Sequence, residues 1–443
     1  MKKWQERAYR YGESVMHVAL LGAMLKWLLY AGVVGILSGS ASALFLASLD
    51  DVTESRMAHP WLLYLLPLGG ALMAYLYVRI GRNAGKGNNL ILEQIQGGQE
   101  RVPLRMAPLV LLGTLLTHLF GGSAGREGTA VQMGGSLSEA VGRALKVDGI
   151  DRQILLMCGI SSGFGSVFGT PLAGTIFALE VVAVGLVSYR AILPCFIASV
   201  VGNLVTIGWG IHHLHYEMGA APDMSWAVVL KVAIASVLFG LAALLFSELT
   251  HGLKKLYAKL LTNPMLRSFV GGLVVIALVF VFQTRDYLGL GIPLIQSSFD
   301  GAVAPLAFLW KTLFTALTLG AGYQGGEVTP LFAIGAALGH SLAGLLHLSA
   351  PFLAGLGFIA VFSGATNTPL ACFVMGIELF GSESMIYMFL ACVVSYLFSG
   401  HTGIYSSQQI GVSKSKLHPL AAGATLGNVK LKKAVRGERD EGL

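Results

Sequence analysis

Two segments of the chain, TPLAGTIFALE at 170–180 and TPLACFVMGIE at 368–378, share their first four letters and both end in glutamate. A second pair, GREGT at 125–129 and GGEVT at 325–329, follows the same order along the chain. The two pairs are offset by 198 and 200 residues, and two ordered matches at nearly equal offsets indicate a duplicated domain. We therefore expect two repeated halves, with Glu127 opposite Glu327.

The composition places this repeat in a membrane. Of 443 residues, 54% are hydrophobic and 12% are charged, whereas soluble domains carry about 25% charged residues. We therefore predict an all-α integral membrane protein, with abundant glycine that favours close packing and broken helices. Apolar runs of spanning or near-spanning length lie at 26–49, 61–78, 104–120, 153–187, 190–209, 226–247, 268–282, 303–321, 330–348 and 384–399.

Basic residues gather at the two ends of the chain. By the positive-inside rule, this distribution predicts that both ends face the cytoplasm. We divide the chain into a cytoplasmic segment at 1–25, a membrane domain at 26–410 and a basic cytoplasmic tail at 411–443, with repeat halves at approximately 26–215 and 226–410. Nucleic-acid binding is disfavoured beside so many apolar runs. The basic residues are Lys2, Lys3, Arg7, Arg10, Lys414, Lys416, Lys430, Lys432, Lys433, Arg436 and Arg439.

Other motifs argue against an enzyme or a metal protein. The chain has no GxSxG, HExxH or P-loop motif, so we expect no catalytic chemistry and no cofactor. HHLHYE at 212–217 lies between apolar runs and does not match a standard metal-ligand spacing. The cysteines lack CxxC spacing and are expected to be packed free thiols, at Cys158, Cys195, Cys372 and Cys392.

Three glycine-rich turns are candidate anion sites. GSAGREGT at 122–129 precedes a predicted helical run at 130–145, GYQGGEVT at 322–329 precedes one at 331–346, and GKGNNLI at 85–91 opens another segment. The start of a helix presents free N–H groups and the positive end of its dipole. Repeated halves of transporters meet near the middle of the bilayer, so these starts predict a cradle for an anion.

At these turns the chain resembles the CLC family of chloride channels and anion/proton antiporters. GREGT is similar to that family's GREGP-type turn, GGEVTP takes the place of its GGIFAP-type turn, and GNNLI lies where GSGIP is usual. HTGIYSS at 401–407 resembles the segment that supplies the family's central tyrosine. The resemblance covers roughly residues 20–410. It implies halves of inverted topology with broken and re-entrant helices, and a homodimer with a separate pathway in each subunit.

The departures from the family pattern resemble the fluoride/proton antiporter branch, CLC-F. Asn88 replaces the usual serine, Thr129 replaces the usual proline and Glu327 adds an acid. The resemblance implies a secondary transporter of the cell inner (plasma) membrane that exports fluoride in exchange for protons. The alternative is a chloride/proton exchanger or a passive anion channel of the same fold. Val181 follows Glu180 where many chloride/proton exchangers have a second glutamate, so their internal proton route is in doubt here.

Two glutamates are the candidates for gating and proton coupling. A carboxylate at a helix start occupies the place of an anion, and protonation removes the charge that holds it there. The resemblance assigns this gating role to Glu127, and the alternative is an ion pair with Arg126. Glu327 is the second candidate, and its alternative role is to stabilise a helix dipole. Glu180 and Glu378 occupy equivalent positions in the repeats, which favours a helix-end or packing role at least as much as transport.

The expected anion-binding residues surround the same turns. The Asn88 amide and the Tyr405 hydroxyl offer hydrogen-bond donors, but Asn88 could instead cap a helix, with Asn89 lining the site. Thr329 donates a hydroxyl or caps its helix, and Tyr405 could be an interfacial anchor. The remaining expected residues are in the turns themselves: Gly125, Arg126, Gly128 and Val328.

Overall fold

The structure is a computed structural model that describes the chain apart from residues 1, 148, 214, 416–419, 422 and 430–443. Lys416 and the basic residues from 430 to 439, on which the expected tail partly rests, lie outside the described residues. The α-helices are α1 (Lys2–Ala58), α2 (Leu66–Leu76), α3 (Asn88–Ile95), α4 (Met106–Leu119), α5 (Glu127–Ala144), α6 (Gly149–Phe168), α7 (Pro171–Glu180), α8 (Ile192–Gly208), α9 (Trp226–Leu260), α10 (Pro264–Phe282), α11 (Ile292–Asp300), α12 (Ala307–Gly320), α13 (Val328–Leu346), α14 (Ala350–Thr366), α15 (Pro369–Phe380) and α16 (Met385–Phe398).

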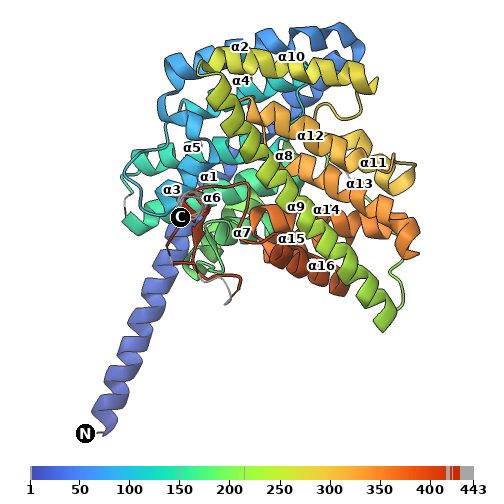
Figure 1. Cartoon of the computed structure of the whole chain (residues 1–443). Coiled ribbons are helices and arrows are strands. Elements are labelled where there is room, and N and C mark those ends of the chain that lie inside the picture. Colours follow the sequence, from blue (N-terminus) through green and yellow to red (C-terminus); the bar gives the residue numbers. More distant parts are fainter. Residues whose placement is uncertain (1, 148, 214, 416–419, 422, 430–443) are drawn as a thin grey trace, which may run out of the picture.

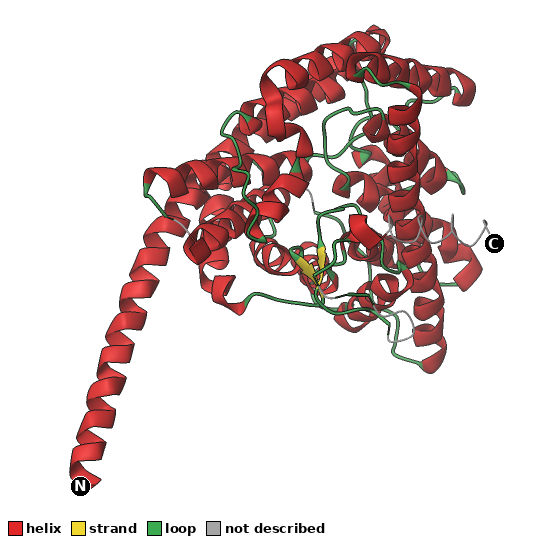
Figure 2. Ribbon diagram, turned by 60° about the vertical axis from the view of Figure 1, so that its left-hand side comes forward, coloured by secondary structure: helices red, strands yellow, loops and turns green. Residues whose placement is uncertain are grey.

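The shorter elements are four single helical turns and two strands. The turns are η1 (Pro60–Leu65), η2 (Tyr77–Gly81), η3 (Arg82–Lys86) and η4 (Tyr189–Ala191). The strands β1 (Ala183–Val184) and β2 (Gln409–Ile410) pair in parallel, so the end of the expected membrane domain joins the segment after α7 (Figure 2).

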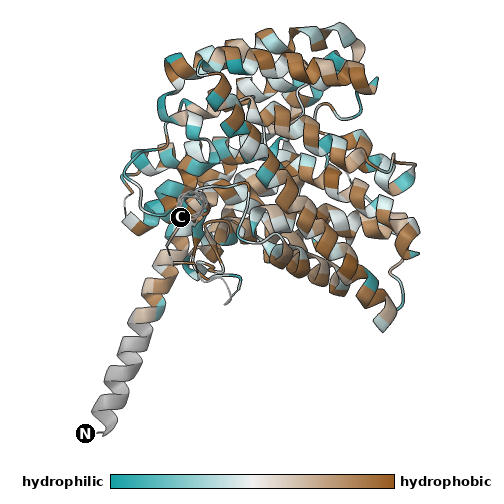
Figure 3. Cartoon of the chain, viewed as in Figure 1, coloured by the Kyte–Doolittle hydropathy of each residue, from teal (hydrophilic) through white to brown (hydrophobic). Residues whose placement is uncertain are grey.

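The expected all-α membrane fold is confirmed. Six described helical segments are long and apolar enough to cross a bilayer. Figure 1 shows α9 running obliquely across the body, α2 and α10 side by side at one end, and the start of α1 projecting from the body. Apolar residues cover much of the outer helices (Figure 3). The six segments are Met16–Ala58, Pro60–Ile95, Tyr189–Gly208, Trp226–Leu260, Pro264–Phe282 and Val328–Leu346.

The apolar run at 153–187 is a broken helix. α6 ends at Phe168, Gly169 has a φ of +72°, and α7 begins at Pro171. The second half breaks at the same place, where Asn367 has a φ of +59° before α15. Glycine and asparagine tolerate this left-handed backbone, and proline suits the first turn of the new helix. Short polar-ended helices inside the membrane are therefore a consequence of the local sequence.

The repeat is visible in the helices, but its register differs from the expected one. α4 and α12 begin at residues 106 and 307, and α5 and α13 at 127 and 328, so both pairs are offset by 201. The positive-φ glycines before them, Gly121 and Gly322, have the same offset. The expectation that Glu127 lies opposite Glu327 is wrong, because matching the letters of the two turns ignored this backbone register. The structural counterpart of Glu127 is Val328.

Glycines bring paired helices into backbone contact in both halves. A Cβ atom at Gly134 of α5 would collide with the carbonyl oxygen of Gly159 on α6. In the second half, a Cβ atom at Gly335 of α13 would collide with the carbonyl oxygen of Gly357 on α14, and the converse also holds. Small residues at such contacts let helices in a membrane gain van der Waals contact along their backbones. The close glycine contact between neighbouring helices therefore occurs in both halves, together with the repeated sequence.

Glu180 and Glu378 hold the two halves together reciprocally. The Glu180 carboxylate accepts hydrogen bonds from the N–H groups of Leu370 and Ala371, at 3.2 and 2.9 Å, at the start of α15. The Glu378 carboxylate accepts them from Leu172 and Ala173, at 2.9 and 2.8 Å, at the start of α7. Each acid thus satisfies free N–H groups and the dipole of a helix in the other half. The helix-end interpretation of this pair is confirmed.

The glycine contacts give a stability prediction. Gly357→Ala places a methyl group against the Gly335 backbone, so we expect a loss of about 1–3 kcal/mol of stability from overpacking. The control is Gly252→Ala on α9, where a Cβ atom would meet nothing within 4 Å and alanine favours the helix. Thermal unfolding of both variants in detergent provides the comparison. Equal unfolding temperatures would contradict the proposed tight contact.

Candidate anion and proton site

The two glycine-rich turns meet each other directly at the boundary between the halves. The Gly125 N–H donates to the Gly326 carbonyl oxygen at 2.6 Å, and the Gly326 N–H donates back to Gly125 at 2.8 Å. A Cβ atom at Gly326 would collide with the Glu127 carboxylate. Glycine is therefore required here, and the paired turns place the starts of α5 and α13 beside the same small volume.

The Glu127 side chain crosses from the first half to the start of α13. Its Oε1 atom accepts a hydrogen bond from the Val328 N–H at 2.8 Å. Its Oε2 atom accepts from the Thr329 N–H at 3.2 Å and the Thr329 hydroxyl at 3.3 Å, and from the Arg126 N–H at 3.1 Å. The residue is only 1% exposed. A carboxylate with these donors occupies the position in which a helix start binds an anion.

Glu327 lies one residue before α13, beside this cluster. It is the N-cap residue of that helix and is partly buried. Glu127 and Lys254 are the charged groups that act on it. The structure therefore brings the two predicted glutamates close together, but they are not related by the repeat. Glu327 precedes the N–H groups that bind Glu127, and its own carboxylate is a separate acid at the same helix start.

Asn88 and Asn89 face different partners, although they are adjacent. Asn88 is the first residue of α3, and its Nδ2 atom lies 3.2 Å from the position that a Cβ atom would take at Gly128. Its Oδ1 atom is buried, and no described residue forms a hydrogen bond with it. Asn89 instead accepts a hydrogen bond from the Ser407 N–H at 2.9 Å. The geometry thus directs Asn88 to the start of α5 and Asn89 to the C-terminal segment.

Gln132 is a polar residue near the site that the sequence did not single out. It lies one helical turn after Gly128 on α5 and is buried. Its amide group is 3.4 Å from the position of a Cβ atom at Gly87, the residue before α3. Its Oε1 atom has no hydrogen-bond partner among the described residues. The sequence carries one signal for this position: Gln132 is four residues after Gly128, and residues one turn apart share a helix face.

Tyr405 reaches the same region from the C-terminal segment. Its side chain is buried, and its ring lies edge-on to Phe177 with 6.5 Å between the ring centres. The segment is fixed by a hydrogen bond from the Ile404 N–H to the Ala365 carbonyl oxygen at 2.9 Å. Glu127 and Glu327 both act electrostatically on Tyr405. The role of the Tyr405 hydroxyl in anion binding stays a prediction.

The Arg126 side chain packs against an aromatic ring beside the site. Its guanidinium group lies over the Phe168 ring, 5.9 Å from the ring centre. It lines a cavity of about 30 Å³ together with Thr329, His213 and Tyr216. Burial, with the nearby charge of Arg126, lowers the pKa of His213 to about 4. The Arg126 N–H and side chain thus serve different sites: the first binds Glu127 and the second gives this cavity a positive charge.

A buried lysine that the sequence did not single out supports the first turn. Lys311 on α12 is fully buried, and its Nζ atom donates to Ser123 Oγ at 3.0 Å and to the carbonyl oxygens of Tyr287 and Gly289 at 3.1 and 2.8 Å. Ser123 Oγ is in turn 2.8 Å from the Thr315 hydroxyl. Because these three acceptors satisfy the amino group, its burial is tolerated, and its Nζ atom lies close to the turn that carries Glu127.

Comparison with known proteins is consistent with this geometry. The family described as voltage gated chloride channel matches residues 69–400. A chloride/fluoride channel protein of Pseudomonas syringae pv. tomato is 49% identical over 418 residues, which cover 93% of this chain and 92% of the relative. An H(+)/Cl(-) exchange transporter, ClcA of Cronobacter sakazakii, is 26% identical, with 86% of this chain and 88% of the relative covered.

Solved structures share the fold over nearly the whole chain. The crystal structure of a CLC-type fluoride/proton antiporter superposes with a TM-score of 0.85 at 34% identity, and covers 87% of this chain and 98% of its own. A slow cyanobacterial Cl-/H+ antiporter has a TM-score of 0.76 at 20% identity, with 93% and 98% covered, and supports the fold alone. With two repeated halves, facing glycine turns and a matched family region, the chain belongs to the CLC family of voltage gated chloride channels.

Proposed function

We propose that the chain is a fluoride/proton antiporter that exports fluoride from the cytoplasm in exchange for protons. The observation that carries this proposal is the Glu127 carboxylate, which takes up the N–H groups of Val328 and Thr329 at the start of α13. A relative at 49% identity is named a chloride/fluoride channel protein, and a structural neighbour at 34% identity is a CLC-type fluoride/proton antiporter. Both names agree with the transport of an anion at this site.

Competition for the same N–H groups provides the mechanism. When Glu127 is ionised, its carboxylate occupies the helix start and excludes an anion from it. When a proton binds, the charge that holds the carboxylate at the dipole is lost, and the N–H groups of Val328 and Thr329 become available to fluoride. Return of the carboxylate requires release of the proton and departure of the anion. Protonation of this one side chain thereby couples the movement of fluoride to the movement of a proton.

The donors around the site suit fluoride. Fluoride is small and strongly hydrated, so a site must replace its water with close and well-aimed hydrogen-bond donors. We assign this task to the amide of Asn88 and the hydroxyl of Tyr405, together with Thr329. The turns supply the remaining contacts, from the backbone of Gly125, Arg126, Gly128 and Val328.

Glu327 is the proposed second acid of the proton route. It directly precedes Val328, whose N–H group binds the Glu127 carboxylate. This placement lets Glu327 receive a proton from Glu127 after a modest side-chain movement. Val181, which follows Glu180, is buried and cannot carry a proton, so the acid of the α13 turn replaces the route that many chloride/proton exchangers use.

The proposal extends to the setting of the protein. We propose a multi-pass protein of the cell inner (plasma) membrane, with both termini in the cytoplasm because of their basic residues. The unit is a homodimer in which each subunit contains its own pathway. The transported ions are the partners, and the mechanism above needs neither covalent chemistry nor a cofactor.

Flux measurements separate antiport from a passive channel or a chloride/proton exchanger. In liposomes that contain the purified protein, an imposed fluoride gradient is expected to drive protons, and a proton gradient is expected to drive fluoride, because coupling is reciprocal. A fluoride-selective electrode and an internal pH dye record the two ions. Fluoride flux without proton movement would identify a channel, and equal chloride flux would contradict fluoride selectivity.

Replacing the gate tests the role of Glu127. Glu127→Gln has no titratable carboxyl, so we expect proton movement to fall to the level of empty liposomes while the protein remains folded. The matched control is Glu383→Gln, which neutralises an exposed acid between α15 and α16 and should leave coupling intact. The two ion fluxes are recorded together in each variant. Wild-type coupling in Glu127→Gln would refute the assigned role.

The paired asparagines separate anion binding from packing. Asn88→Ala removes a proposed donor to a charged ligand, so we expect fluoride affinity to fall roughly tenfold to a hundredfold. Asn89→Ala removes the acceptor of the Ser407 N–H and should lower thermal stability while leaving fluoride affinity near that of the wild type. Isothermal titration with fluoride and thermal unfolding give the two readings. The reverse result would assign the anion site to Asn89.

A conservative change at Glu327 tests the second acid. Glu327→Gln keeps the size of the side chain and removes its proton, so we expect proton flux to drop while fluoride still binds. Fluoride affinity from calorimetry and proton flux from the liposome assay are compared in the same preparation. Equal losses of binding and coupling would show that Glu327 supports the site's structure instead of carrying protons.

A further inference from the structure

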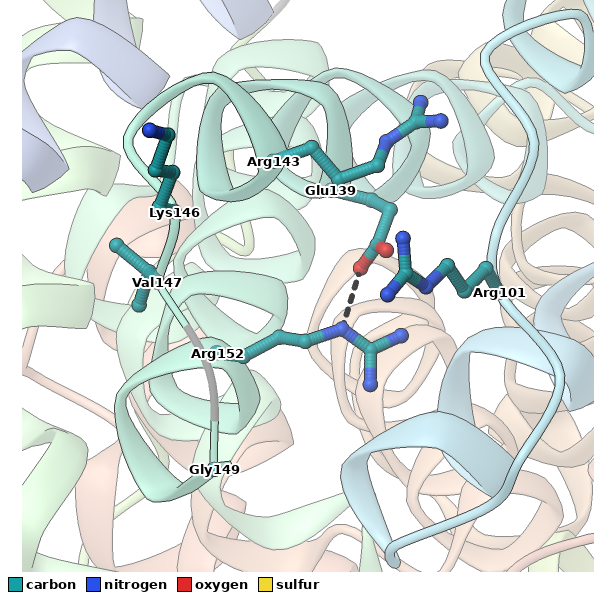
Figure 4. Close-up of a pocket in the computed structure, with 7 residues that line it drawn as sticks. All are labelled: Arg101, Glu139, Arg143, Lys146, Val147, Gly149 and Arg152. Atoms are coloured by element: carbon teal, nitrogen blue, oxygen red, sulfur yellow. Dashed lines mark hydrogen bonds and ion pairs between the residues drawn. The ribbon is translucent and has the colours of Figure 1, made fainter.

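An open basic pocket lies at the far end of α5 from Glu127. Its volume is about 420 Å³. It is bounded by the loop after α3, the last turn of α5, and the connection to the first turn of α6 (Figure 4). It is therefore separate from the anion and proton site. The residues that line it are Arg101, Glu139, Arg143, Lys146, Val147, Gly149 and Arg152.

Among the described residues that line this pocket, Glu139 is the only acid, and Arg152 pairs with it. Arg152 Nε donates to Glu139 Oε2 at 2.9 Å, and Arg152 Nη2 donates to Gln94 Oε1 at 3.4 Å. The Glu139 side chain is only 1% exposed, so this ion pair is part of the protein interior. The pair fixes the Arg152 side chain at the wall of the pocket. It does not compensate the charge of the other basic residues.

Three further basic residues line this pocket. Arg101, Arg143 and Lys146 are exposed, and no described residue forms an ion pair or side-chain hydrogen bond with any of them. Figure 4 shows the guanidinium groups of Arg101 and Arg143 on the same side of the pocket as the Arg152–Glu139 pair. Among the described lining residues, the basic side chains thus outnumber the acid, and this excess of positive charge favours an anionic ligand.

The donors have the geometry that a phosphate group requires. A guanidinium group presents paired N–H donors that match two phosphate oxygens. The 20-residue helix α6 begins at Gly149, in the wall of the pocket, and directs the positive end of its dipole to this side. The pocket is also larger than one phosphate group, so a substituted phosphate fits. These features together indicate a phosphate-bearing ligand.

The level of the pocket points to a lipid as the source of that phosphate. Asp151 in the first turn of α6 forms an ion pair with Lys26 of α1. Lys26 lies over the rings of Trp27 and Tyr30, 5.4 and 5.7 Å from their centres. A tryptophan and a tyrosine beside a lysine at the end of an apolar run are typical of the interface between bilayer and water.

Apolar side chains surround the basic ones at this level. Leu104, Leu145 and Ile150 are exposed by 48%, 43% and 56%, and each is within a few residues of a basic residue of the pocket. Such a rim suits the acyl chains of a lipid whose headgroup occupies the pocket. We propose that this pocket binds the phosphate group of an anionic membrane lipid, from the leaflet next to the first turn of α6.

Native mass spectrometry of the full-length protein tests this site. Delipidated protein is titrated with phosphatidylglycerol, with phosphatidylcholine and, in a separate arm, with inorganic phosphate. We expect selective phosphatidylglycerol adducts. In the double variant Arg101→Gln/Arg143→Gln, we expect their dissociation constant to rise on the order of tenfold or more, because each basic residue contributes to binding of an anionic lipid.

A charge-matched double variant is the control. Arg190→Gln/Lys255→Gln removes two exposed basic residues elsewhere and should leave phosphatidylglycerol binding unchanged. Equal unfolding temperatures in the two double variants verify folding, and the single variants Arg101→Gln and Arg143→Gln serve if the double variant unfolds. Unchanged lipid adducts in Arg101→Gln/Arg143→Gln, or equal losses in the control, would overturn the site. Equal affinity for phosphatidylcholine, or inorganic phosphate that binds as tightly as lipid, would overturn the anionic lipid as its ligand.

Discussion

The structure depends on one kind of interaction: a carboxylate from one half binds the free N–H groups at the start of a helix in the other half. Glu127 does so at α13, Glu180 at α15 and Glu378 at α7. In a membrane these N–H groups have no water to bind, so each contact satisfies backbone donors and a helix dipole together. The same contacts join the two halves. The breaks in the helices therefore leave backbone N–H groups without partners in their own helix, and the contacts that satisfy these groups join the two halves.

Symmetry distinguishes the structural acids from the proposed gate. Glu180 and Glu378 are exchanged by the repeat, and each satisfies its partner helix. Glu127 has no such counterpart, because Val328 occupies the equivalent position in the second half. The N–H group of Val328 instead binds the Glu127 carboxylate. The interaction occurs once, and its release does not break a matched pair. This asymmetry suits the gating role proposed for Glu127, because its carboxylate must leave the start of α13 and return to it.

The surroundings of Glu127 offset the cost of a charge in the membrane. An unpaired ionised group in an apolar medium costs many kcal/mol, but Glu127 receives its hydrogen bonds from backbone N–H groups and a hydroxyl. The buried Lys311 donates a hydrogen bond to Ser123 in the same turn. Glycine at 326 leaves the space that the carboxylate needs. These features stabilise a negative charge, whether it belongs to the side chain or to an anion that replaces it.

The sequence by itself determined the class of fold, the repeat and the residues of the turns. These depend on local rules: apolar length, letters that recur at a fixed offset, and glycine before a helical run. It also singled out Glu127 and Glu327, since charged residues are rare among apolar runs. Asn88 and Tyr405 followed from the resemblance to the CLC family, and the transport roles of all four stay predictions. The sequence could not separate Asn88 from Asn89, because both lie at the start of α3 and only their partners differ.

Only the tertiary structure decided how these pieces meet. It placed Val328 opposite Glu127, because backbone register depends on hydrogen bonds between halves and not on matching letters. It also revealed Lys311, whose partners Tyr287 and Gly289 come from a different segment and whose charge is hidden inside an apolar run. The physical reason is the same in both cases. The position of a polar group in a membrane protein depends on the hydrogen-bond partner that satisfies it, and in both cases that partner is distant in the sequence.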